Sequence, residues 1–389
     1  MSTQKVRRPA DRKAQILRAA AAQFHERGFH EVGLGDIAGA VGISAPALYR
    51  HFRGKRDLLA AVVADGFAVM DAAVRDAATL DDAVRSMAEL SVERRELGVL
   101  WQREVRHLDE PVRGETRQRF RDLVARLEGL LGDRRAELSP GDADLLVWSM
   151  VAVLGSPSHA RIAVSEGRLA ALLEQMSHTV LGARLPTPSG VPVPRGAAPS
   201  ADRAAASRRE SLVSAATRFF GQQGFHEARL EEIGAAAGIA GPSVYKHFAS
   251  KSDLLYAALN RGAQALQLAL AEAMASADDP RQVLRALLRA YVGLVQTHTD
   301  LFAALVTEVI HLPDDQRHDV RRTQRDHVLE WEHLLGQCRP DLPRSERQVR
   351  VRAVLGLVND VLRTEHLRSR PALAQDLVVL GESLLLPGD

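Results

Sequence analysis

The sequence predicts an all-α protein built from two tandem units, each with a three-helix head followed by a helical bundle. Residues 12–63 and 208–259 align without a gap, and 22 of their 52 positions are identical. Residues 100–131 align with residues 304–335 at 12 of 32 positions, so the duplication extends beyond the heads. Between the proline breaks, apolar residues recur at helical spacing without strand-like alternation, which favours bundles of helices.

The repeat divides the chain into five segments. The first head covers residues 1–57 and the first body 58–182, and the second head covers 208–253 and the second body 254–389. Residues 183–207, between the copies, are rich in Pro, Gly, Ala and Ser. We expect this segment to be a flexible, partly extended linker.

Composition excludes several classes of protein. The single cysteine, Cys338, rules out an intrachain disulfide framework or a cysteine-rich metal cluster. No apolar run reaches the length of a transmembrane helix, and the N-terminus lacks the apolar centre of a signal peptide. We therefore expect a cytoplasmic protein.

Positive charge is concentrated around the heads. The net charge of the chain is only +2, but residues 1–63 carry eleven Lys or Arg and five Asp or Glu. Residues 195–259 carry eight basic and six acidic residues. The first head is thus the more basic, which suits an anionic partner.

The first two helices of the head follow from apolar spacing and glycine. Ile16, Ala20 and Phe24 recur every four residues in a helix that starts near Arg12, and Gly28 is a natural stop. Leu34, Ile37 and Val41 mark the second helix. A turn glycine, Gly42 or Gly238, follows it in each copy and can take the left-handed conformation that ends a helix sharply.

A short third helix must follow this turn. In the first copy Ser44 is a plausible N-cap and Pro46 falls in the first helical turn, where a missing N–H costs little. Leu48 and Phe52 lie four residues apart and can point inward. The residues left outward are Ala45, Ala47, Tyr49, Arg50 and His51. A helix end with small residues in front and hydrogen-bonding groups behind is typical of a DNA recognition helix.

Lysine recurs at the start of the next helix. The chain has five lysines against 46 arginines, yet both copies keep one here, at Lys55 and Lys251. A cation at a helix N-terminus opposes the macrodipole, so we expect another charge, such as a DNA phosphate, to stabilise it.

Residues 42–59 and 238–255 both resemble the helix-turn-helix of the TetR family of bacterial transcriptional regulators. The turn glycine, the proline, Tyr-x-His-Phe and Lys-x-Asp-Leu-Leu form a specific pattern, and it occurs twice. The resemblance implies double-stranded DNA as partner, with phosphate contacts from Tyr49, His51, Lys55, Tyr245, His247 and Lys251. It also implies that bases are faced by Ala45, Pro46, Ala47 and Arg50, and by Gly241, Pro242, Ser243 and Lys246.

The bodies contain Glu-x-x-His twice, at Glu104 and His107 and at Glu308 and His311. Two such pairs in one bundle with further carboxylates bind di-iron, but each pair here lies in a separate copy without an evident companion. We interpret them as hydrogen-bonding groups. Since no nucleophile elbow, phosphate loop or His-Glu-x-x-His occurs, we predict neither an enzyme nor a metal or cofactor.

Aromatic and methionine side chains of the bodies are most simply core. The resemblance also implies a pocket for a small-molecule inducer lined by some of them: Met87, Trp101, Phe120, Trp148, Met150, Tyr291, Phe302 and Trp331. It further implies dimerisation through helices around 142–163, 166–182, 346–366 and 372–386. One chain can supply both halves of that interface as an intramolecular pseudo-dimer, and further homodimerisation is left open.

The sequence therefore predicts a ligand-responsive DNA-binding regulator, most simply a repressor, that reads a quasi-palindromic operator with two recognition helices from one chain. The alternative is a ligand-binding or protein-interaction module whose second head has lost DNA binding.

Overall fold

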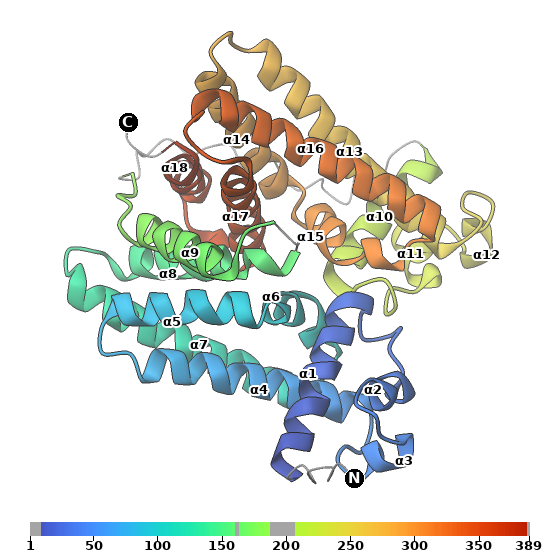
Figure 1. Cartoon of the computed structure of the whole chain (residues 1–389). Helices are drawn as coiled ribbons and strands as arrows, with labels where there is room; N and C mark the ends of the chain where they lie inside the picture. The colour runs from blue at the N-terminus through green and yellow to red at the C-terminus, as the bar shows by residue number, and fades with distance from the viewer. Residues whose placement is uncertain (1–8, 160–162, 187–206, 387–389) are drawn as a thin grey trace. The chain divides into compact units, whose positions relative to one another are not determined.

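The computed structural model describes residues 9–159, 163–186 and 207–386. The chain divides into two compact units, residues 1–178 and 179–389, and each is described by itself. Helices account for all regular structure in the described ranges, which contain no strand (Figure 1). The all-α prediction is confirmed. Most of the predicted linker, residues 187–206, lies outside the described residues.

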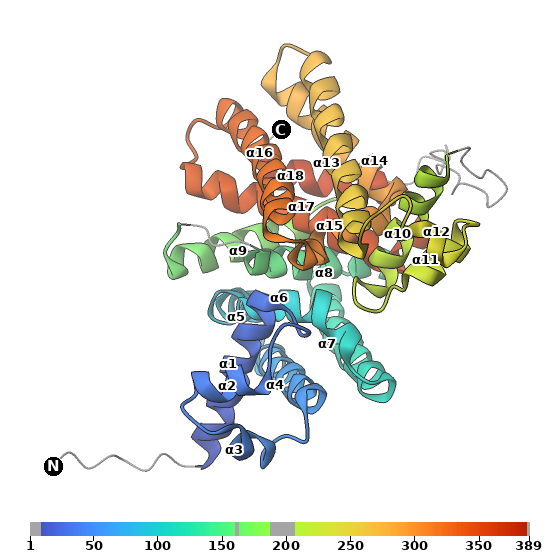
Figure 2. The ribbon, with the colours of Figure 1, turned by 90° about the vertical axis from the view of Figure 1, so that its right-hand side faces the viewer.

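The head of the first unit consists of α1 (Pro9–Arg27), α2 (Leu34–Ala40) and α3 (Ala45–Tyr49). Ile16, Ala20 and Phe24 are fully buried along α1, as their spacing predicts. The helix ends at Gly28, whose φ of +82° is in the left-handed region that favours glycine. Figures 1 and 2 both show α2 and α3 at the end of the unit farthest from α8 and α9.

The body of the first unit begins with α4 (Lys55–Arg75), which packs against α1 and α7. The following elements are α5 (Leu80–Glu93), α6 (Glu96–Val99), the π-turn η1 (Leu100–Glu104), the 3₁₀ turn η2 (Val105–His107), α7 (Glu110–Arg134), α8 (Pro140–Gly155), the 3₁₀ turn η3 (Ser156–His159) and α9 (Glu166–Leu181). The helix expected over 142–163 thus ends at Gly155, because Pro157 lacks the N–H that a continuing helix needs.

The second unit repeats this order. Its elements are α10 (Arg208–Gln223), α11 (Leu230–Ala236), α12 (Gly241–Val244), α13 (Lys251–Ala275), α14 (Pro280–Thr297), α15 (Thr299–Thr307), η4 (Val309–His311), α16 (Asp314–Cys338), α17 (Arg344–Arg363), η5 (Leu367–Ser369) and α18 (Leu373–Leu385). Within this unit α14 packs against α16, α17 and α18. No helix in the described part of the chain is both long and apolar enough to cross a membrane.

Candidate nucleic-acid interface

The turn between the second and third helices is built the same way in both heads. Gly42 and Gly238 have φ of +67° and +69°. This conformation lets the next residue bond back to the preceding helix: Ile43 N–H donates to the Ala38 carbonyl at 3.0 Å, and Ile239 N–H to the Gly234 carbonyl at 2.8 Å. A left-handed glycine closing a helix in this way fixes the direction of the chain that follows. The prediction that both glycines take the left-handed conformation is confirmed.

The short helix α3 presents its polar end to solvent. Leu48 and Phe52 are buried, which holds the helix on the head, whereas Arg50 and His51 are exposed and Tyr49 is 56% exposed. Tyr49 therefore presents its ring and its hydroxyl to solvent. Ser44 caps the helix, because its Oγ accepts the Ala47 N–H at 3.3 Å.

The second head repeats the exposure but not the cap. Val244 and Phe248 are buried beneath α12, and Tyr245 is 57% exposed beside the exposed Lys246. His247 is half-buried. Ala240 occupies the N-cap position and makes no side-chain hydrogen bond there.

The residues predicted to face bases lie at the N-terminal end of each short helix. Pro46 is exposed, and Ala45, Ala47 and Ser243 are partly exposed. Gly241 and Pro242 begin α12, but their exposure to solvent lies outside what the structure describes. Their base contacts stay predictions.

Lys55 and Lys251 have internal partners that the sequence did not indicate. Lys55 Nζ donates to the carbonyl oxygens of His30 at 3.1 Å and Val32 at 3.0 Å, and lies 4.6 Å from the centre of the Phe29 ring. Burial lowers the pKa of Lys55, and the nearby carboxylates of Glu31 and Glu104 offset only part of this shift. Two carbonyls and an aromatic face therefore stabilise this ammonium within the head. Its phosphate contact remains a prediction.

Lys251 repeats the arrangement in the second unit. Its Nζ donates to the His226 carbonyl at 3.2 Å and lies 4.7 Å from the centre of the Phe225 ring. Burial lowers its pKa as well. The preference for lysine at both positions thus has a structural explanation, since a compact ammonium fits between a carbonyl and a ring.

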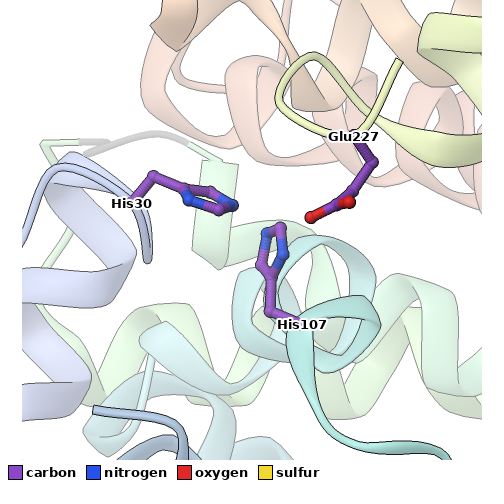
Figure 3. A group of neighbouring side chains, drawn as sticks. All are labelled: His30, His107 and Glu227. Carbon is purple, nitrogen blue, oxygen red and sulfur yellow. The ribbon is translucent and has the colours of Figure 1, made fainter. Parts of the chain in front are cut away.

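The two Glu-x-x-His pairs lie where body meets head within each unit. The buried carboxylate of Glu104 accepts the Phe29 N–H through Oε2 at 3.0 Å, and Glu308 accepts the Phe225 N–H at 2.8 Å. His107 stacks on Phe29 with ring centres 5.2 Å apart. The rings of His107 and His30 are nearly perpendicular, with centres 4.6 Å apart (Figure 3). The hydrogen-bonding interpretation of these glutamates is therefore confirmed.

The second glutamate oxygen is held differently in the two units. In the first, Oε1 of Glu104 pairs with the Arg103 guanidinium, whose Nη2 also donates to the Phe24 carbonyl at 2.7 Å. In the second, the hydroxyl of Thr307 donates to Glu308 at 2.6 Å. In the first unit, Arg103 thus adds a charge-assisted hydrogen bond to the C-terminal end of α1.

Sequence comparison matches the heads that carry this geometry. The family model for bacterial regulatory proteins of the tetR family matches residues 16–62 and again residues 212–258. A second model, for a tetracyclin repressor-like C-terminal domain, matches residues 277–363. Both heads are therefore TetR-family heads, and the chain carries two copies. This assignment agrees with the prediction that the protein is not an enzyme.

The chain is similar to several named HTH-type transcriptional regulators. It is 36% identical over 89 residues to the HTH-type transcriptional activator FasR of Mycolicibacterium smegmatis, covering 23% of this chain and 41% of FasR. It is 30% identical over 139 residues to the HTH-type transcriptional repressor NicS of Pseudomonas putida, covering 34% of this chain and 60% of NicS. The matches thus span less than two thirds of these relatives.

A solved structure of a TetR-family transcriptional regulator from Bordetella parapertussis 12822 matches 47% of this chain and 96% of its own. The TM-score is 0.43 and the sequence identity 22%.

The two bodies have differently built cores. In the first, Met87, Phe120 and Met150 are buried, and Trp101 and Trp148 are half-buried. The Phe120 ring stacks on Trp101 with ring centres 4.4 Å apart and contacts Trp148 at 5.1 Å. Phe67, which sequence reasoning did not select, packs edge-on against Trp101 at 5.6 Å.

In the second body the predicted residues Tyr291, Phe302 and Trp331 are all buried. They are joined by two polar residues that the sequence did not single out as functional. Asn359 Nδ2 donates to the Tyr291 hydroxyl at 2.9 Å, and Trp331 Nε1–H donates to His327 Nε2 at 3.0 Å. Neither Asn359 nor His327 is selected from the sequence, although His327 lies one helical turn before Trp331 on the same helix.

Proposed function

We propose that this TetR-family protein is a DNA-binding transcriptional regulator that reads two half-sites with two heads from one chain. The observation that carries the proposal is the recognition-helix end repeated in both heads, with Tyr49 and Tyr245 more than half exposed beside an exposed cation, Arg50 or Lys246. Tyrosine hydroxyls and cations at such a helix end suit phosphate and base contacts in a major groove.

Charge supports the same proposal. Eleven basic against five acidic residues in 1–63 give the first head a net positive field. Such a field attracts the phosphate backbone over long range and makes binding depend on salt.

A second candidate, in which only the first head binds DNA strongly, is favoured by two observations. The N-cap of α12 is Ala240, which cannot bond the helix N–H groups. Glu231 and Glu232 are exposed in the first turn of α11, where they bring negative charge to the face that a phosphate backbone must approach.

We further propose that a small-molecule inducer binding to a body controls release of DNA, and that the output is repression. NicS, the longer of the two matches described above, is named a repressor, whereas the activator FasR matches over only 89 residues. The buried aromatic residues of both bodies are the candidates for contacting the inducer.

We also propose that the two bodies pair as an intramolecular pseudo-dimer through α8 and α9 with α17 and α18. Light scattering then gives a mass near 42.4 kDa for the free chain and one chain bound per operator. A mass of twice this value on a perfectly symmetric operator indicates a dimer of chains that uses one kind of head.

The decisive experiment is selection of genomic DNA fragments bound by the full chain, followed by titration of the selected site at several salt concentrations. The proposal expects two similar but unequal half-sites and a steep negative slope of log affinity against log salt. A flat salt dependence, or enrichment of no sequence, overturns DNA binding as the function. Enrichment of a single half-site supports the second candidate.

A further inference from the structure

The core of the second body contains a hydrogen-bonding cluster that the first body lacks. The two bodies align with an offset of 204 residues, as the equivalent helix ends at Arg135 and Arg339 show. At this offset Tyr291, His327, Trp331 and Asn359 correspond to Met87, Leu123, Leu127 and Gly155. Since the first body folds with residues that form no side-chain hydrogen bonds, the fold itself does not require the polar set.

Hydrogen bonding fixes the state of His327. Its Nε2 accepts the indole N–H of Trp331 at 3.0 Å, so this nitrogen carries no proton in the neutral ring. Burial lowers the pKa of His327 to about 4, which keeps the ring neutral at pH 7. The proton therefore lies on Nδ1, which becomes an N–H donor.

This donor has no partner. Within the described residues, His327 Nδ1 is buried and makes no hydrogen bond, and the side chain is only 6% exposed. The amide oxygen of Asn359 is likewise buried without a partner. Buried polar atoms are satisfied in nearly all native structures, so an unpaired donor and acceptor in one core require either a bound molecule or an internal water.

Both side chains contact Tyr291. Asn359 bonds its hydroxyl, and the His327 ring lies nearly parallel to its ring with centres 6.3 Å apart. Phe302 and Trp331 pack edge-on against the same ring at 5.9 and 5.8 Å. The three polar side chains come from α14, α16 and α17, which pack against one another. The cluster thus combines an N–H donor, a hydroxyl and a carbonyl acceptor with aromatic walls.

We propose that the second body binds a neutral aromatic or aliphatic molecule carrying a carboxamide-like group, through His327, Asn359 and Tyr291. The carbonyl oxygen of the ligand accepts the His327 Nδ1–H, its N–H donates to Asn359 Oδ1, and its apolar part lies against Phe302 and Trp331. This inference rests on the proposed ligand control, and it assigns that control to the second body.

The charges around the cluster favour a neutral ligand over an anionic one. The ring of His327 is neutral. Burial raises the pKa of Tyr291, and the negative charge of Asp360, next to Asn359, raises it further, so that charge acts on the cluster. A carboxylate placed here would meet this negative charge and no positive group among the three ligand-binding side chains. Binding a neutral amide leaves no buried charge unpaired.

Benzamide is the probe, with benzoate and ethylbenzene as its charged and non-hydrogen-bonding analogues. The full chain with Trp101→Phe and Trp148→Phe has Trp331 as its single tryptophan, so its fluorescence reports on the cluster. We expect benzamide to change this fluorescence saturably at millimolar concentration and to bind at least about tenfold more tightly than either analogue, the factor that corresponds to one hydrogen bond.

His327→Leu restores the residue of the first body and is expected to weaken benzamide binding about tenfold or more. Asn359→Ala provides a second test if His327→Leu fails to unfold cooperatively. Met87→Leu, in the first body, is the matched control and should leave binding unchanged. The proposal is overturned if both His327→Leu and Asn359→Ala bind benzamide as tightly as the unsubstituted chain, or if no binding occurs at millimolar concentration. The unpaired atoms are then satisfied by internal water only. Tighter binding of benzoate also overturns it.

DNA binding is measured separately, on a selected DNA fragment with and without benzamide. Saturable, His327-dependent binding without any effect on DNA keeps the site and refutes ligand control by it. Normal DNA binding in a chain that binds no benzamide refutes the site and leaves the proposed regulator standing.

Discussion

The carboxylate of Glu104 accepts the backbone N–H of Phe29 at 3.0 Å, across 75 residues of sequence. Glu308 and Phe225 repeat this bond at 2.8 Å in the second unit. In each unit, the bond joins the end of the body segment before α7 or α16 to the turn that follows the first helix of the head. The bond therefore links that body segment directly to the head of its unit.

Replacing Glu104 by alanine should destabilise the first unit. The change leaves the Phe29 N–H and the Nε–H of the buried Arg103 without their acceptor, and a hydrogen bond to a charged group contributes about 1.5–3 kcal/mol. Urea unfolding measures the loss. Glu308→Ala is the matched variant and should cost less, since Thr307, a neutral hydroxyl, replaces Arg103 as the neighbouring donor. Equal losses from the two variants would contradict the role assigned to Arg103.

The two heads differ in the N-cap of their third helix. Ser44→Ala removes the side-chain acceptor for the Ala47 N–H and should destabilise α3 by about 0.5–2 kcal/mol. The reciprocal change, Ala240→Ser, should stabilise α12 by a similar mechanism and strengthen DNA binding through the second head. Gel-shift titration of both variants on one selected site measures the effect. A weaker complex with Ala240→Ser would show that the missing cap does not limit the second head.

Phosphate and base contacts are separable by variants of neighbouring residues. Tyr49→Phe removes only a hydroxyl and should weaken binding about equally on all DNA sequences. Arg50→Ala should change the preferred base at one position, because a good base contact discriminates by about 1–3 kcal/mol. Affinities for a panel of single-base operator variants test both. If Tyr49→Phe changes the ranking of the panel, its assignment to phosphate is wrong.

Histidine variants compare the two heads more cleanly than lysine variants, since Lys55 and Lys251 also hold the turns of their own heads. We expect His51→Ala to abolish detectable binding, because the first head is capped and more basic. His247→Ala should lower the affinity and leave a residual complex. DNA titrations of both variants at one salt concentration measure the two losses of affinity. Equal losses would mean that the heads contribute equally.

Stability of the second unit should fall in mild acid because of His327. Its pKa is about 4 in the folded state against an ordinary value of 6.5, so the unfolded chain binds a proton that the folded chain does not between these values. Stability is therefore fully present above pH 6.5 and falls by about 2 kcal/mol by pH 5. Urea unfolding at pH 7.5 and pH 5 measures this, and His327→Leu should remove that part of the difference. An unchanged pH dependence in the variant would contradict burial of a neutral imidazole.

The sequence was sufficient for the heads because their structure is set by local rules. Glycine at φ of +67° and +69°, a serine cap and apolar residues four apart determine where short helices begin, end and bury a face. The same rules, repeated 196 residues later, showed the tandem arrangement.

Tertiary structure decided the partners of residues far apart in the chain. The role of Lys55 depends on carbonyls 23 and 25 residues away, and that of Glu104 on a backbone N–H 75 residues away. Packing of α14 against α16 places His327 beside Tyr291, a contact that the sequence does not show. Periodicity determines which face of a helix is buried, but the hydrogen bonds of a buried polar group depend on which other helix packs against that face.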